Sequence, residues 1–266
     1  MKQDNLNDVA RQFAVVFAAI FQVYASYTVG MSVATIAFEF RSLIFPATYA
    51  FAIWGPIFIL CGIYALYQAL PAQRAHPVFR AIGWWTVAAF LANGLWSYAY
   101  TNRQFILAQA IIFGGFVFAG GAFARFVRGA PAVNTATVES FIVGPALGLL
   151  FGWITAANIV GLAGTLIALG LAATGQGAAI GGAALLLLGS AVGFFVIIDS
   201  KRGPAGAWVP FGAAVLWALV AVIIAERSIS ALTTAAAAAS VLLVLLAMIG
   251  PWSTPSRSLR RPATAM

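Results

Sequence analysis

Residues 140–198 contain no Asp, Glu, Lys or Arg, and this uncharged stretch constrains the fold more than any other feature of the chain. A helix that crosses the hydrocarbon core of a bilayer needs about 20 apolar residues. The stretch is long enough for two crossings and a connection, and it is tight for three. Gly175, Gln176 and Gly177 best suit a turn. We therefore predict two membrane-spanning helices that meet at this turn.

The rest of the composition agrees with a membrane protein. Of the 266 residues, 63% are hydrophobic and 8% are charged, and that charged fraction is about a third of what solvates a typical soluble domain. A water-soluble domain and a disordered chain are both excluded. One Cys excludes a disulfide framework and a cysteine-rich metal site, and one His removes most His-based sites. The predicted fold class is all-α, a polytopic bundle of membrane helices.

The same window of about 20 residues predicts about eight spans along the chain. They cover residues 12–31, 46–70, 81–101, 104–126, 141–163, 177–198, 207–225 and 230–250. The first span is longer than a signal-peptide core, and no clear cleavage site of small residues follows it, so we expect it to be retained. Helical spans indicate a bacterial inner membrane or its equivalent, because outer-membrane proteins normally cross as β-barrels.

The cationic side chains test the count of eight independently. One side of the predicted membrane carries Lys2, Arg11, Arg74, Arg80, Arg125, Arg128, Lys201, Arg202, Arg257, Arg260 and Arg261, and the other carries Arg41, Arg103 and Arg227. Cationic loops stay in the cytoplasm, so both termini are expected there, including a basic tail at 252–266. The net charge of +8 is scattered between apolar spans, which argues against nucleic acid as a partner.

No acidic side chain and no Lys falls in the middle of a predicted span. The acids are Asp4, Asp8, Glu39, Glu139, Asp199 and Glu226, all at span ends or in loops. Ion-coupled transporters and proton pumps usually hold such a group at mid-membrane, so proton-coupled transport loses support. His76 is expected to be a solvated loop residue. Cys61 is expected to be inert packing, because a buried thiol far from cations stays protonated.

What remains inside the spans is aromatic and amide chemistry. Four tryptophans lie too deep for an interfacial belt to explain them, namely Trp54, Trp96, Trp153 and Trp217. Each offers a flat face and an N–H that needs a partner, so helix packing and stacking on a planar ligand both remain open. Asn93 and Asn158 are costly at bilayer depth unless they bond to a neighbouring helix or to a ligand. Asn93 shares a helix face with Trp96, three residues later.

Gly144, Gly148 and Gly152 form a ridge of small residues on the predicted fifth span. Glycine at this spacing lets another backbone approach closely, either within the chain or across a dimer. Pro56 and Pro145 are expected to kink their spans, because proline removes a helix hydrogen bond. Kinks near Trp54 and Trp153 would open room for an internal pocket.

Three motifs occur in the order and on the spans of a known family. The chain resembles the TspO/MBR family, the tryptophan-rich sensory proteins that include the mitochondrial translocator protein, at residues 45–58 (FPATYAFAIWGPIF), 91–97 (LANGLWS) and 152–158 (GWITAAN). Tyr49 stands where the family commonly has Trp, and Phe58 where it commonly has Tyr. Asn158 follows Trp153 sooner than is usual. The resemblance covers about residues 10–170.

This resemblance implies a five-helix TspO-like unit over residues 1–170, followed by a three-helix extension over 171–251, as in longer bacterial relatives. It implies an intramembrane pocket that opens toward residues 32–45 and binds tetrapyrroles, such as protoporphyrin IX or haem, or similar planar ligands. No cofactor is required. The resemblance implies ligand-binding roles for Tyr49, Phe51, Trp54, Phe58, Asn93, Trp96, Trp153 and Asn158. The extension is expected to serve packing or oligomerisation, in a homodimer or a larger membrane complex.

Four functions remain open from the sequence. A sensor or carrier for a porphyrin or a similar hydrophobic ligand fits the motifs and the uncharged spans. A transporter of an uncharged solute and a structural subunit of a larger membrane complex are alternatives. An enzyme that degrades porphyrin has little support, because the sequence shows neither a nucleophile with its base nor a metal site.

Overall fold

The computed structural model describes residues 2–28, 33–132 and 137–251, and the regular elements in these ranges are helices. In chain order they are α1 (Lys2–Thr28), α2 (Val33–Glu39), the 3-10 helix η1 (Thr48–Ile53), α3 (Trp54–Ala69), the 3-10 helix η2 (Pro71–Gln73), α4 (Pro77–Thr101), α5 (Phe105–Ala132), α6 (Thr137–Ala168), α7 (Gln176–Ser200), α8 (Ala205–Glu226) and α9 (Ala231–Ile249). Within these described ranges, eight spans are long and apolar enough to cross a membrane, with η1 and α3 forming one of them. This confirms the predicted helical bundle. The predicted tail at 252–266 lies outside the described residues.

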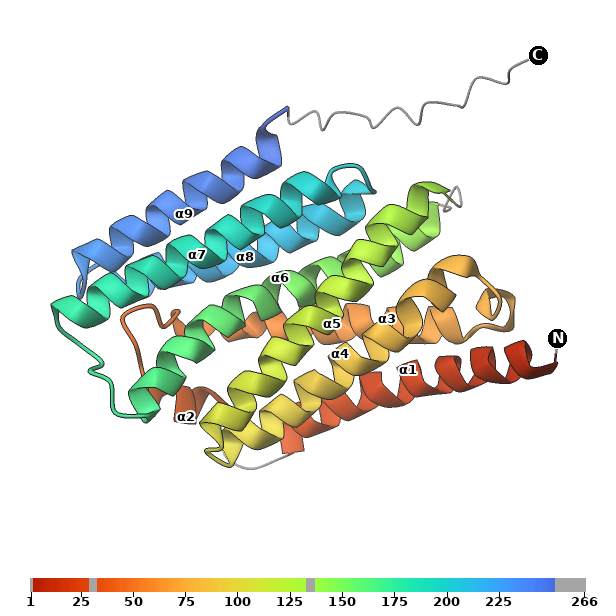
Figure 1. Cartoon of the computed structure of the whole chain (residues 1–266), viewed down its shortest axis with the longest axis horizontal. Coiled ribbons are helices and arrows are strands. Elements are labelled where there is room, and N and C mark those ends of the chain that lie inside the picture. The colour runs from red at the N-terminus through yellow and green to blue at the C-terminus, as the bar shows by residue number, and fades with distance from the viewer. Residues whose placement is uncertain (1, 29–32, 133–136, 252–266) are drawn as a thin grey trace, which may run out of the picture.

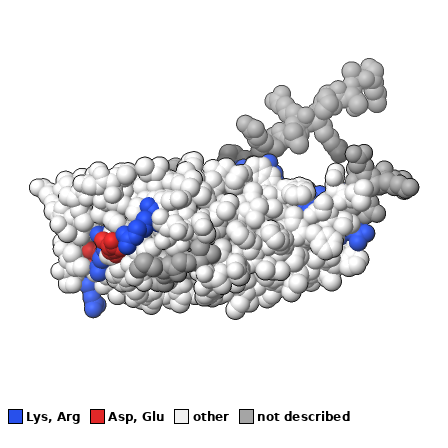
Figure 2. All heavy atoms as spheres, turned by 90° about the horizontal axis from the view of Figure 1, so that it is seen from below, with Lys and Arg blue, Asp and Glu red and all other residues white. Residues whose placement is uncertain are grey.

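The spans form two neighbouring groups. In Figure 1, α1, α3, α4, α5 and α6 pack together, α8 and α7 lie against α6, and α9 packs on α7 and α8. The short helix α2 crosses the end of the first group that is far from the N-terminus. Figure 2 shows charged side chains gathered toward the two ends of one face, with an uncharged band between them. Such a band matches the hydrocarbon core of a bilayer.

Glycine and proline set the ends of several helices. Gly170 (φ 100°) follows α6 and Gly175 (φ 93°) precedes α7, so the connection uses the backbone region that glycine enters without a Cβ penalty. The predicted turn at Gly175 therefore falls at the start of α7. The kink expected at Pro56 inside a span is wrong, because Pro56 lies in the first turn of α3, where a missing N–H breaks no helix bond. Pro145 does lie inside α6.

The glycine ridge joins the extension to the five-helix group. A Cβ added to Gly144, Gly148 or Gly152 would come closer than 3.0 Å to backbone atoms of residues 206–211 in α8. The backbones of α6 and α8 therefore touch, which the absence of side chains on the ridge permits. Of the two partners that the sequence left open for the ridge, the structure shows a helix of the same chain.

Candidate functional site

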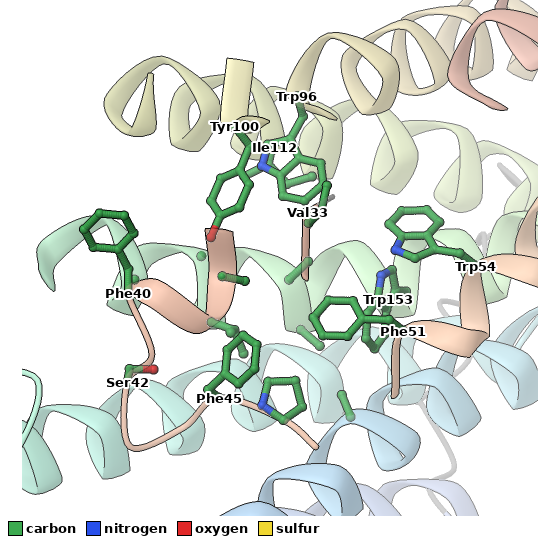
Figure 3. Close-up of a pocket in the computed structure, with 18 residues that line it drawn as sticks. Val33, Phe40, Ser42, Phe45, Phe51, Trp54, Trp96, Tyr100, Ile112 and Trp153 are labelled. Carbon is green, nitrogen blue, oxygen red and sulfur yellow. The ribbon is translucent and has the colours of Figure 1, made fainter. Parts of the chain in front are cut away.

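An apolar cavity lies within the bundle beside α2. Its walls come from α2 and the connection after it, from η1 and α3, and from α4, α5, α6 and α8 (Figure 3). The cavity volume is about 70 Å³, which is room for about five water molecules. Its aromatic lining consists of Phe40, Phe45, Phe51, Trp54, Trp96, Tyr100 and Trp153.

Two groups of rings face each other across this cavity. Trp96 and Tyr100 lie one turn apart on α4, with ring centroids 5.2 Å apart and planes 21° apart. Opposite them in Figure 3, the ring of Trp153 on α6 meets Phe51 and Trp54 edge to face, with both centroid distances at 6.2 Å. Edge-to-face and offset contacts are the arrangements that ring quadrupoles favour. Ring faces and ring edges from the two groups therefore line a space without charged side chains.

The polar groups at the cavity are few and mostly donors. Within the described residues, the indole N–H groups of Trp54, Trp96 and Trp153 and the hydroxyl of Tyr100 have no hydrogen-bond partner. An indole N–H in apolar surroundings usually finds an acceptor. A ligand with a flat apolar body would pack against the rings, and acceptor atoms on that body would accept hydrogen bonds from these donors. No group of three His, Cys, Asp or Glu gathers in the described part of the chain.

The sequence model of a family described as TSPO-like protein matches residues 8–249. The chain belongs to this TSPO-like family. The match confirms the resemblance found in the three motifs, and it includes the extension as well as the first five spans. No curated protein and no solved structure matches the chain.

Of the eight ligand-binding residues predicted from the TSPO-like motifs, four line the cavity: Phe51, Trp54, Trp96 and Trp153. Two more are aromatic neighbours outside its lining. Phe58 stacks on the side of Trp54, with centroids 5.2 Å apart. Tyr49 packs edge-on against Trp217, with centroids 5.1 Å apart, and its side chain is partly exposed. Phe58 therefore packs behind a lining ring, whereas Tyr49 contacts a tryptophan that does not line the cavity.

The two predicted amides are not among the residues that line the cavity, and both bond to neighbouring helices. Asn93 is buried, and its Nδ2 donates to Gln22 Oε1 of α1 at 3.3 Å. Asn158 Nδ2 donates to the carbonyl of Ile112 in α5 at 3.2 Å, and Gln109 Nε2 reaches Asn158 Oδ1 at 3.5 Å. In the structure, both amides bond to neighbouring helices, as polar side chains between membrane helices commonly do.

Sequence reasoning missed several lining residues. Tyr100 had a usable signal, because it lies four residues after Trp96 and so on the same helix face. Phe45 directly precedes Pro46 in the quoted motif and also lines the cavity. Ala218 of α8 had no such signal, since nothing in a run of small apolar residues marks which one meets a distant helix.

Ion pairs hold the segment that forms the α2 wall. Arg103 Nη1 and Nη2 donate to the two Glu39 carboxylate oxygens at 2.8 and 2.7 Å, joining the end of α2 to the turn between α4 and α5. The hydrogen bond from Arg103 lowers the pKa of Glu39. Arg41 donates to Glu226 Oε1 of α8 at 3.0 Å, and Glu226 is fully buried. The wall is therefore tied to both helix groups.

His76 differs from its expectation as a solvated loop residue. It directly precedes α4, as a loop residue would, but it is half-buried and its ring lies 5.2 Å from the ring of Phe79. Packing against an aromatic ring explains this burial. Cys61 is buried, as expected for a packing residue.

Proposed function

We propose that this TSPO-like membrane protein binds a planar hydrophobic ligand in the aromatic cavity, as a sensor, a regulator or a carrier. The supporting observation is that three tryptophans face one uncharged cavity while their N–H groups lack partners within the described residues. A tetrapyrrole such as protoporphyrin IX or haem is the ligand class that the family resemblance favours. The protein needs no cofactor for this function.

The size of the cavity defines what binding requires. Ligand sites for drug-sized molecules usually hold about 300–1,000 Å³, and an apolar cavity of about 150 Å³ binds a single benzene ring. The present 70 Å³ must therefore widen for a fused aromatic ligand, and further for a macrocycle. Residues 33–45 form a wall that contains only the short helix α2 and the connection after it. We propose that this wall moves outward when a planar ligand binds, and furthest for a tetrapyrrole, while the rings on α4 and α6 keep their places.

The proposed location is the cytoplasmic membrane of a bacterium, with both termini in the cytoplasm. The cationic side chains support this orientation, because those of the terminal side outnumber those of the other side. In this orientation α2 and the cavity lie toward the non-cytoplasmic face. A ligand would then enter from that face or from the bilayer.

Titration of the purified protein with protoporphyrin IX, followed by tryptophan quenching, tests the proposal. We expect saturable binding in the micromolar range. The double variant Trp54→Phe/Trp96→Phe removes two N–H donors from the cavity, and the affinity should fall about tenfold or more.

The matched control is Trp84→Phe/Trp208→Phe, which removes the same number of indoles from positions that do not line the cavity. It should bind protoporphyrin IX as the wild type does. If a folded wild-type protein shows no saturable quenching, or if both double variants bind equally, the proposed site is wrong.

A further inference from the structure

A second apolar cavity lies on the other side of the contact between α6 and α8, where α7 closes it. Its lining includes Ile159 of α6, Leu186 and Ser190 of α7, and Val215 and Leu219 of α8. We call this space the annex. The volume of the annex is about 30 Å³, which is room for about two water-sized groups.

The annex and the aromatic cavity share part of their walls. Ala156, Val160 and Ala218 line both spaces. The glycine ridge holds α6 against α8 up to Gly152; Ala156 and Val160 lie one and two helical turns beyond it on α6, and Ala218 lies on α8. Beyond Gly152 the two helices are separated by side chains, and those side chains are small. Ala156, Val160 and Ala218 thus present only methyl and isopropyl side groups to the wall that the two cavities share.

The hydroxyl groups that line the annex need no hydrogen bond from a ligand. The hydroxyl of Ser190 donates to the Leu187 carbonyl of its own helix at 2.9 Å, and that of Thr155 donates to the Phe151 carbonyl at 2.8 Å. Both hydroxyls are therefore satisfied without a ligand. An apolar space without unpaired polar groups stays dry, and filling it restores dispersion contacts that its lining lacks.

We infer that the annex receives a short aliphatic substituent of the ligand whose planar part lies among the tryptophans. This inference rests on the proposed function and specifies its ligand class: a flat aromatic body with a side group of about two carbons. The planar part lies against α4 and α6, and the side group passes Ala156 and Ala218 toward α7. The three-helix extension thereby takes part in ligand selection.

Anthracene and 2-ethylanthracene are suitable probes, because both accept energy from tryptophan and they differ only in the two-carbon group. We expect the wild type to bind 2-ethylanthracene about threefold or more tightly than anthracene, once partition into detergent micelles is subtracted. Ser190→Leu fills the annex and should abolish this ratio while leaving the affinity for anthracene unchanged. The matched control Ala184→Leu adds the same side chain to the exposed face of α7 and should keep the ratio.

A second variant tests the annex by enlarging it. Leu219→Ala removes a buried side chain from its lining, so 2-tert-butylanthracene should bind this variant about threefold or more tightly than it binds the wild type. Thermal melting of each variant shows that it is folded before its affinity is compared. This gain does not depend on whether Ser190→Leu folds.

The outcomes separate the two proposals. If anthracene binds and Trp54→Phe/Trp96→Phe weakens it, but the ethyl group adds the same affinity in the wild type and in Ser190→Leu, the annex inference is overturned and the proposed function stands. If the folded wild type binds protoporphyrin IX but shows no saturable binding of anthracene or 2-ethylanthracene, the annex inference alone is overturned, and if it binds none of the three, both proposals are overturned. The annex is established if Ser190→Leu loses the preference for 2-ethylanthracene while Ala184→Leu keeps it, and if Leu219→Ala binds 2-tert-butylanthracene more tightly than the wild type does.

Discussion

At the residue scale, a side chain that does not line the aromatic cavity holds its wall in place. Trp217 of α8 donates its indole N–H to the carbonyl of Ala50 at 2.9 Å. Ala50 belongs to η1, which also carries Phe51 into the cavity. Of the four tryptophans inside the spans, three line the cavity and Trp217 supports it. Their sequence positions alone do not separate these roles.

Trp217→Phe is predicted to weaken ligand binding without removing any cavity-lining atom. The Ala50 carbonyl loses its indole donor, and an unpaired polar group in apolar surroundings costs about 1–3 kcal/mol. We expect a lower melting temperature and a several-fold weaker affinity for protoporphyrin IX in the quenching titration. Trp84→Phe, at an exposed position outside the cavity, should change neither. An unchanged affinity in Trp217→Phe would contradict the supporting role.

The ion pair between Glu39 and Arg103 gives the α2 wall a defined pH dependence. The pKa of Glu39 lies below the ordinary value of 4.5 in the folded protein because Arg103 donates to the carboxylate. The pair therefore stabilises the wall above about pH 4.5, and this contribution is lost as the pH falls through the lowered pKa. Hydrogen-exchange protection of α2, corrected for intrinsic rates, should fall in that acidic range. Glu39→Gln should show the reduced protection at neutral pH as well.

At the element scale, the contact between α6 and α8 decides how the two helix groups meet. It is tight along Gly144, Gly148 and Gly152 and wider beyond them, where the aromatic cavity and the annex lie on its two sides. The same pair of helices therefore provides both the closest backbone contact and the walls of both cavities. The close contact lies where glycines of α6 meet α8, and Ala156 and Val160 of α6 line both cavities beyond it.

Gly148→Ala is predicted to destabilise the protein by about 1–3 kcal/mol, because the added Cβ would overlap the backbone of α8, which has no flexible side chain to move aside. Gly62→Ala is the matched control. Its Cβ would meet nothing within 4 Å, and alanine favours a helix interior over glycine by about 0.5–1 kcal/mol. Unfolding in a detergent or denaturant titration measures both. Equal stability of the two variants would contradict the described contact.

At the scale of the whole molecule, the extension and the first five spans share one set of contacts. Besides the glycine ridge, the Ala47 N–H donates to the Ala221 carbonyl at 3.0 Å, and Arg41 pairs with Glu226. Ala218 of the extension lines the aromatic cavity itself. The TSPO-like match over residues 8–249 likewise runs through both parts. The cavity therefore depends on helices from both groups.

A chain that ends at residue 170 is predicted to lose its native packing. It would expose the glycine ridge and remove the partners of Ala50, Ala47 and Arg41. We expect aggregation in size-exclusion chromatography and no saturable protoporphyrin IX binding. Co-expression of residues 171–266 as a separate chain should restore a monodisperse, ligand-binding complex. A truncated protein that is monodisperse and binds with wild-type affinity would show that the extension is dispensable.

The sequence by itself determined the helical class, the count of spans and the family. It did so because a bilayer core admits only helices and closed barrels, whose backbone bonds are internal, and because long apolar runs of about 20 residues are what a spanning helix needs. It also predicted four of the aromatic lining residues, since they belong to motifs with fixed spacing on single helices.

Only the tertiary structure decided that Asn93 and Asn158 bond to helices, that Trp217 supports η1, and that the glycine ridge meets α8. It likewise placed Ala218 at the wall between two cavities. Each of these outcomes depends on which helix lies beside which. Between membrane helices that choice is made by close packing and scattered hydrogen bonds, rather than by an apolar pattern, because every face of such a helix is apolar.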